Sequence, residues 1–270
     1  MPTLMLPRKS SRTLKQTALL RTEPELRRAL DIGLSVLLLL LAAPVLVWTV
    51  LAIKLSSPGP IFYRQERVGL HGRLFQIWKL RTMRASGPGG PCVTAQDDSR
   101  ITPLGRYLRS WKLDELPQLF NVLCGDMSLV GPRPQVPCFV ACFDPERRRV
   151  VLSVRPGITG PTALYFRHEE YLLAGQADRE RFYIGHILPV KLQMDTEYIR
   201  TRSLSSDLRT LADTLHLVLS RLAGRAGHSG IPAALVLPAL QTAEAQAAEA
   251  QAAEMCQQAS ELVQMAEMAQ

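Results

Sequence analysis

The 270-residue chain has little cysteine, and its five cysteines are odd in number and irregularly spaced. It contains no pair of CxxC motifs, which argues against a zinc site, and reduced thiols are expected. It also lacks a metalloprotease helix motif, a phosphate-binding P-loop and the glycine fingerprint of dinucleotide-binding folds. The five histidines are scattered and are taken as structural or solvated.

Positive charge is in excess, with a formal net charge of +8 and a pI near 9.5. Such a balance suits anionic partners, which include nucleic acid, phosphorylated substrates and an anionic membrane face. No basic patch interleaved with aromatic residues is present, so nucleic acid is not an expected partner.

One long hydrophobic run, residues 32–53, reads "IGLSVLLLLLAAPVLVWTVLAI" and carries no charge. Its length meets the roughly 20 residues of a spanning helix, and its all-round hydrophobicity argues against a buried core helix. Pro44 lies at its centre and predicts a kink or break, while basic residues on both flanks favour a cytosolic location for both ends. We therefore predict a re-entrant membrane helix over residues 31–54, broken at Pro44, with an ordinary kinked span as the alternative.

The rest of the chain predicts an α+β, mostly helical fold. "IFYRQERVG" and "RLFQIWKLRTM" alternate apolar and polar residues around "GLHG" and predict a β-hairpin. Helical spacing follows in "DDSRITPLGRYLRSW" and in residues 204–224, the second a core or membrane-interface helix. "ASGPGGPC", residues 85–92, predicts a flexible loop.

Four regions result. They are a basic N-terminal segment (1–30), the membrane helix (31–54), a compact cytosolic catalytic domain with interfacial helices (55–225) and an Ala/Gln/Glu-rich tail (226–270). The tail favours helix and predicts either a solvated helix or a segment for homo-oligomerisation.

Residues 110–134, "SWKLDELPQLFNVLCGDMSLVGPRP", combine acidic residues with glycines and prolines typical of turns. Pro117 is tolerated only in the first turn of a helix, so Asp114 and Glu115 should lie at a helix N-terminus, where backbone amides and the dipole stabilise negative charge. An ionised Asp114 could be a nucleophile or a metal ligand. Glu115 could hold Mg²⁺ or manage protons.

Arg133 is enclosed by two prolines, which limit the backbone and present a fixed guanidinium suited to phosphate. Arg106 and Arg109 precede the acidic pair and could reach the same anion. Each piece alone would be an ordinary helix cap or a surface ion pair. Their combination with a membrane segment and a basic surface favours a phosphate site.

The chain resembles the bacterial sugar transferase family of monotopic polyprenyl-phosphate phosphoglycosyl transferases. The resemblance runs from about residue 27 to about residue 219 and rests on "SSPGPIFYRQERVG", "FQIWKLRTM", "DDSRITPLGRYLR", "LDELPQLFNVLCGDMSLVGPRP", "RPGITG" and "ILPVKLQMDTEYI". It implies transfer of a sugar 1-phosphate from a UDP-sugar to undecaprenyl phosphate, with Mg²⁺ and release of UMP. It also implies contact with membrane lipids at the bacterial inner membrane, with the active site on the cytosolic face.

The resemblance also implies residue roles. Asp114 and Glu115 match the catalytic pair and the expected Mg²⁺ ligands, with Asp114 carrying the phospho-sugar covalently. Arg109 and Arg133 are expected at phosphates or the nucleotide, and Lys79 matches a further basic position. The family's helix break is typically Ser-Pro, whereas this chain has Ala43 before its proline. The alternative is a membrane scaffold or anionic-ligand-binding protein without catalysis.

The re-entrant topology is testable by labelling. Single cysteines placed near Thr22 and near Ser57, in a background without native cysteines, should both resist a membrane-impermeant thiol reagent applied from the periplasm, because basic flanks keep both ends cytosolic. Labelling at the site near Thr22 alone would mean an ordinary span.

Overall fold

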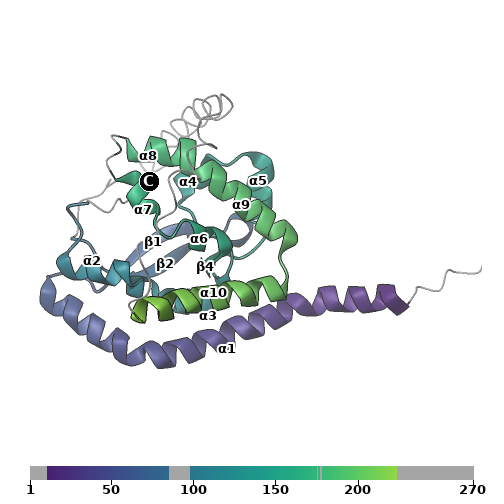
Figure 1. Ribbon diagram of the computed structural model, residues 1–270, viewed down its shortest axis with the longest axis horizontal. Coiled ribbons are helices and arrows are strands. Elements are labelled where there is room, and N and C mark those ends of the chain that lie inside the picture. Colours follow the sequence, from purple (N-terminus) through teal and green to yellow (C-terminus); the bar gives the residue numbers. More distant parts are fainter. Residues whose placement is uncertain (1–10, 85–97, 175, 177, 224–270) are drawn as a thin grey trace, which may run out of the picture.

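A computed structural model describes residues 11–84, 98–174, 176 and 178–223. The fold is mostly helical, as predicted, with one long helix passing beneath a body of shorter helices and two small sheets (Figure 1). The predicted loop 85–92 and the tail 226–270 lie outside the described residues. In chain order the elements are α1 (Ser11–Ser56), β1 (Phe62–Val68), η1 (Leu70–Gly72), β2 (Leu74–Leu80), α2 (Pro103–Ser110), η2 (Leu113–Glu115), α3 (Gln118–Cys124), β3 (Ser128–Val130), α4 (Pro137–Ala141), α5 (Pro145–Val151), β4 (Gly157–Thr159), α6 (Pro161–Tyr165), α7 (Glu169–Leu173), α8 (Arg179–Phe182), η3 (Tyr183–Ile187), α9 (Leu188–Thr201) and α10 (Leu204–Leu222).

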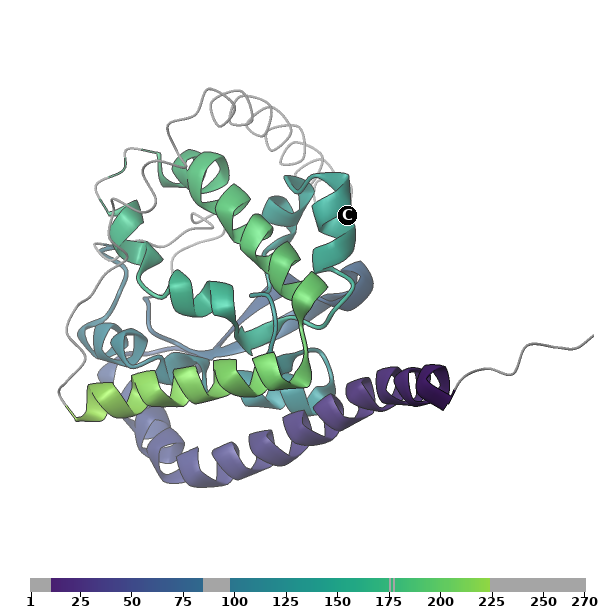
Figure 2. The same cartoon turned by 45° about the vertical axis from the view of Figure 1, so that its right-hand side comes forward.

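Helix α1 continues through Pro44 without an interruption. The expected break is therefore absent, and α1 instead curves beneath the rest of the protein (Figures 1 and 2). Bending is the usual way for a helix to absorb the lost amide and the ring of an internal proline. The predicted boundary between residues 30 and 31 lies inside α1, and the re-entrant arrangement stays a prediction.

Residues Pro24–Ser56 of α1 are long and apolar enough to cross a membrane, and only 11% of their most apolar window is buried in the protein. Packing against the rest of the protein therefore does not explain why this helix is so hydrophobic. Its exposed apolar surface indicates membrane association. Helix α10 lies beside α1 in both views (Figures 1 and 2). It also exposes apolar side chains, which are Leu208, Leu215, Val218, Leu219 and Leu222.

The predicted hairpin is confirmed. Strands β1 and β2 are antiparallel, in a register that runs from Phe62 opposite Leu80 to Val68 opposite Leu74. The register and the alternation of side chains along a strand place Arg67 and Lys79 on the same face. This face contributes two of the cations described below.

The second sheet pairs β3 with β4 in parallel and joins the Pro-Arg-Pro segment to the "RPGITG" segment. The two strands' ends approach so closely that a Cβ on Gly157 would lie 2.1 Å from the amide nitrogen of Gly131. Only glycine allows that approach, which explains why "RPGITG" needs its first glycine.

Two residues of α1 fasten it to the segments around the acidic pair. Arg28 donates from Nη1 to the Val122 carbonyl at 2.6 Å and from Nη2 to the Leu123 carbonyl at 2.9 Å, which satisfies the C-terminal end of α3. Asp31 Oδ1 accepts a hydrogen bond from the Leu129 amide at 2.9 Å. The apolar helix is therefore bound to α3 and to β3 by polar contacts.

Asp207, on α10, joins α10 to α1 and α9. Its carboxylate accepts from Arg27 Nη1 at 2.8 Å, from the Tyr198 hydroxyl at 2.7 Å and from Arg202 Nη2 at 3.2 Å. The side chain is buried, so these three contacts replace its lost hydration.

The thiols differ from expectation in one respect. Cys124 is a free thiol, but Cys142 is disulfide-bonded, so the prediction that all the thiols are reduced was wrong.

The contact of Asp207 with α1 predicts a loss of stability on substitution. Asp207→Asn keeps the shape but leaves two arginines without their carboxylate, and should lower the free energy of unfolding by about 2 kcal/mol. The melting temperature in detergent should fall by about 5 °C. Asp213→Asn, on the exposed side of the same helix, is the matched control. Equal melting temperatures for the two variants would contradict the anchoring role.

Candidate functional site

The acidic pair lies where the sequence predicted, just before a helix. Asp114 and Glu115 form the short 3-10 turn η2, and Pro117 is the residue before the first turn of α3. Lys112 enters this turn in the left-handed conformation, with φ 56°. The chain therefore reverses sharply between α2 and α3, and the two carboxylates lie at that corner.

Glu115 is shared by two cations from distant segments. Lys79 Nζ, on β2, donates to Oε1 at 3.1 Å. Arg133, between its prolines, donates from Nη1 to Oε2 at 3.2 Å and from Nη2 to Oε1. This two-pronged contact uses the planar fork of arginine, which a lysine could not reproduce.

The ion pairs decide the protonation of Glu115. Burial raises the pKa of its carboxyl, but the charges of Arg133 and Lys79 outweigh burial and hold that pKa well below its ordinary value. Burial also lowers the pKa of the Lys79 ammonium, a shift that the charge of Glu115 opposes. Glu115 is therefore a permanent anion that holds two cations in place.

Asp114 has the opposite environment. Its side chain is buried, with 7% of the residue exposed, and its Oδ1 has no hydrogen-bond partner among the described residues. Burial, and then the charge of Glu115, raise the pKa of this carboxyl. Stabilisation of the anion by the helix N-terminus, which the sequence predicted, is thus outweighed by burial.

Arg109 lies near the acidic pair but is not bonded to it. Its Nη1 contacts the sulfur of Met83 at 3.7 Å, and its Nη2 lies 4.0 Å from Oε2 of Glu170. Its positive charge still lowers the pKa of Asp114. Arg106 is exposed on α2.

The sequence did not assign three residues that the structure brings to the site or next to it, which are Arg67, Glu169 and Lys191. Arg67, on the hairpin face of Lys79, donates to the Pro134 carbonyl at 2.9 Å, and burial followed by the charge of Arg133 lowers its pKa. The charge of Glu115, and more weakly that of Glu169, raises the pKa of Arg133. Glu169 also pairs with Lys191. The motif "RQERVG" was the signal that could have pointed to Arg67.

Asn121 sets the spacing between β2 and α3. Its Oδ1 accepts from the Trp78 amide at 3.1 Å, and its Nδ2 donates to the Gln76 carbonyl at 2.8 Å. These bonds satisfy backbone groups of β2 that a neighbouring strand would otherwise pair with. They also hold Lys79, which follows Trp78, against Glu115. A buried amide that satisfies backbone groups in this way makes the corner rigid.

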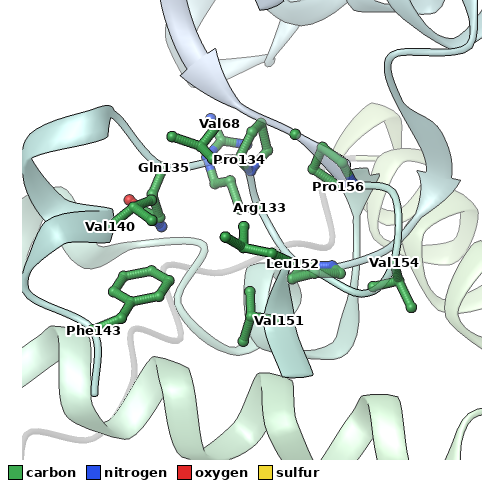
Figure 3. A pocket seen from close by; sticks show the side chains of 12 residues that line it. Val68, Arg133, Pro134, Gln135, Val140, Phe143, Val151, Leu152, Val154 and Pro156 are labelled. Carbon is green, nitrogen blue, oxygen red and sulfur yellow. The ribbon is translucent and has the colours of Figure 1, made fainter. Parts of the chain in front are cut away.

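A hollow lies beside the Pro-Arg-Pro segment, and Figure 3 shows the side chains that line it. Most of them are apolar, including Val68, Val140, Phe143, Val151 and Leu152. Arg133 and Gln135 also line it, but neither Asp114 nor Glu115 does, so we place the candidate site at the carboxylate corner.

The fit to Mg²⁺ differs between the two acids. In the described part of the chain, no group of three or more His, Cys, Asp or Glu side chains is placed to hold a metal. Asp114 has an oxygen without a partner, whereas both oxygens of Glu115 are taken by Lys79 and Arg133. Because Mg²⁺ is often bound by one carboxylate completed by substrate phosphates, Asp114 fits such a site and Glu115 fits it poorly.

Comparison with known proteins matches residues 22–221 to the family described as bacterial sugar transferase. The chain is 41% identical over 198 residues to a UDP-glucose:undecaprenyl-phosphate glucose-1-phosphate transferase of Caulobacter vibrioides, covering 72% of this chain and 70% of that protein.

Two further relatives are longer. The chain is 37% identical over 203 residues to a UDP-N-acetylgalactosamine-undecaprenyl-phosphate N-acetylgalactosaminephosphotransferase of Aeromonas hydrophila, covering 74% of this chain and 45% of that protein. It is 39% identical over 192 residues to an Escherichia coli K12 protein with the same name as the Caulobacter one, covering 68% and 38%. The chain therefore spans less than half the length of these two relatives.

The charge of Lys79 predicts a measurable effect on Asp114. Because Lys79 lowers the pKa of this carboxyl, Lys79→Met should raise it further. Dicyclohexylcarbodiimide reacts with protonated carboxyls, so the pH midpoint for labelling Asp114, followed by mass spectrometry, should move to higher pH. Lys54→Met, at the exposed end of α1, is the control. A midpoint that is unchanged or lower would contradict the electrostatic assignment.

Proposed function

Because the chain belongs to the bacterial sugar transferase family, we propose that it transfers a sugar 1-phosphate from a UDP-sugar to undecaprenyl phosphate and releases UMP. The observation that carries the proposal is the buried, unpartnered oxygen of Asp114 beside two cations that Glu115 holds. The relatives' names give the two substrate classes, and the site supplies a nucleophile and positive charge for a phosphoryl centre.

In the first step, one carboxylate oxygen of Asp114 attacks the phosphorus that carries the sugar, and the other oxygen is the one that would hold Mg²⁺. A bond forms between the attacking oxygen and phosphorus, and the bond from phosphorus to the bridging oxygen of the diphosphate breaks. Its electron pair leaves with UMP. Arg133 and Arg109 are the side chains that would stabilise the charge on the transferred group and on the leaving phosphate.

In the second step, an oxygen of undecaprenyl phosphate attacks the same phosphorus. The new diphosphate bond forms as the bond to Asp114 breaks, and the carboxylate is regenerated. Attacking and leaving groups are anions in both steps, so the cycle needs no net proton transfer.

Glu115 then has a positioning role. Its low pKa makes it a poor proton carrier, which argues against the proton-handling role considered from the sequence. Its contacts with Lys79 and Arg133 hold both cations at the corner before substrate arrives, and such preorganisation is what stabilises a transition state.

Mg²⁺ is part of the proposal, with Asp114 as its protein ligand. When bound, the ion would neutralise charge on the diphosphate. Lys79 and Arg133 keep Glu115 occupied, so donor phosphates would complete the ion's ligands.

The membrane arrangement supports a lipid acceptor. The apolar surface of α1 and α10 indicates membrane association, and Arg28 ties α1 to the end of the helix that follows the acidic pair. A site held this close to a membrane helix can meet a lipid-anchored phosphate and a water-soluble nucleotide. We assign the protein to the bacterial inner membrane with the site facing the cytosol, where nucleotide sugars are made.

The test is loss of the nucleophile. Asp114→Asn keeps the size of the side chain but removes the attacking anion, and should lower UMP release with UDP-glucose, undecaprenyl phosphate and Mg²⁺ by at least about a thousandfold. Arg133→Lys should be milder but still harmful. Asp213→Asn should match the wild type.

The covalent step gives a sharper measurement. Wild-type protein with donor but no lipid should release up to one equivalent of UMP and gain the mass of a sugar phosphate on the peptide that contains Asp114. An adduct on another residue would overturn the assignment. No UMP release with any of a panel of UDP-sugars would favour the scaffold or ligand-binding alternative.

A further inference from the structure

Helix α7 places two adjacent glutamates against two different cations. Glu169 Oε2 accepts from Lys191 Nζ, and Glu170 Oε2 lies 4.0 Å from Arg109 Nη2. Leu173, at the end of the same helix, is almost fully buried and anchors it in the core. The two acids therefore reach from one short helix to α9 on one side and to α2 on the other.

Lys191 makes the α9 side of this arrangement rigid. The residue is 5% exposed, and its ammonium lies 3.4 Å from the Tyr183 hydroxyl and 5.4 Å from the centre of the Phe166 ring. Burial lowers the pKa of Lys191, but the charges of Tyr183 and Glu169 outweigh burial and raise it. A buried ammonium with these partners fixes the position of Glu169 and thus of α7.

The guanidinium of Arg109 needs a partner outside α2 to hold it in place, because few contacts within its own helix restrain it. It lies in the last turn of α2, and within the described residues its side chain makes a weak contact with the Met83 sulfur and a second contact with Glu170. Arginine carries about 2 kcal/mol of rotamer entropy, so an unsupported side chain would spend much of its time away from Asp114. Glu170 is the anion that limits this freedom.

We propose that Glu170 is a positioning residue, which holds the guanidinium of Arg109 beside Asp114 so that it meets the transferred phosphoryl group. The inference rests on the proposed function for its catalytic consequence. The contact itself is independent of that function. Arg109, the charge that would lose its partner, is 23% exposed at its side chain, so replacing Glu170 leaves no fully buried charge without a partner.

The kinetic test is Glu170→Gln, which removes the charge and keeps the length. We expect kcat for UMP release to fall about tenfold, with a smaller change in KM for the donor, because misplacing a group that acts in the transition state affects kcat most. Glu170→Asp should recover part of the rate. Glu197→Gln, on the exposed side of α9, removes the same charge as a control and should leave kcat unchanged.

A double-mutant cycle separates positioning from a general effect. In an Arg109→Gln background, Glu170→Gln should have no further effect, since its role passes through Arg109. An equal loss in both backgrounds would overturn the proposal, as would wild-type kcat in the Glu170→Gln variant. Melting temperatures within 1 °C of each other, roughly the scale expected for an exposed pair, exclude loss of folding.

A labelling experiment tests the contact without turnover. Phenylglyoxal modification of Arg109, read by tandem mass spectrometry, should be several-fold faster in Glu170→Gln than in the wild type or Glu197→Gln, because the released guanidinium is more accessible. Equal rates would overturn the proposal. If Arg109 is labelled faster in Glu170→Gln but the wild type never releases UMP, the proposed function is wrong. The contact by which Glu170 restrains Arg109 would still be supported.

Discussion

The rest of the site depends on one carboxylate, that of Glu115, which two partly buried cations share. The contact joins the η2 turn to β2 through Lys79 and to the Pro-Arg-Pro segment through Arg133. These three segments are separated in the sequence, and the Glu115 carboxylate connects them. Removing the carboxylate would leave two cations facing each other in a partly desolvated place. The same ion pairs therefore determine both how the segments of the corner pack and how charge is distributed there.

The two neighbouring acids illustrate how environment divides roles between identical groups. Asp114 is buried with an unpartnered oxygen and a raised pKa, while Glu115 is paired and its pKa is held low. Two carboxyl groups whose environments separate their pKa values are suited to different tasks. Here one acid keeps an oxygen without a partner and the other holds two cations, which is the division of roles that the proposed mechanism uses.

Helix α1 is bound at short range to the segments around the acidic pair. Arg28 satisfies the C-terminal carbonyls of α3, and the N-terminal end of α3 follows Pro117 and the acidic pair. Asp31 holds β3, which leads to the Pro-Arg-Pro segment, and Asp207 holds α10 alongside. These polar contacts therefore hold α1 in a fixed position relative to the acidic pair.

Local patterns in the sequence determined the hairpin, the helix of residues 204–222 and the place of Asp114 before a helix, because alternation, helical spacing and the limits on Pro117 act over a few residues. The prolines around Arg133 made it a candidate directly, whereas Lys79 became a candidate only through the resemblance to a family. Only the tertiary structure decided that Glu115 is an anchor for cations and that Arg109 pairs with α7. It also decided that α1 curves through its central proline without interruption. Partners separated by many residues leave no periodic signal, and a carboxyl's protonation is set by burial and by charges that folding brings together.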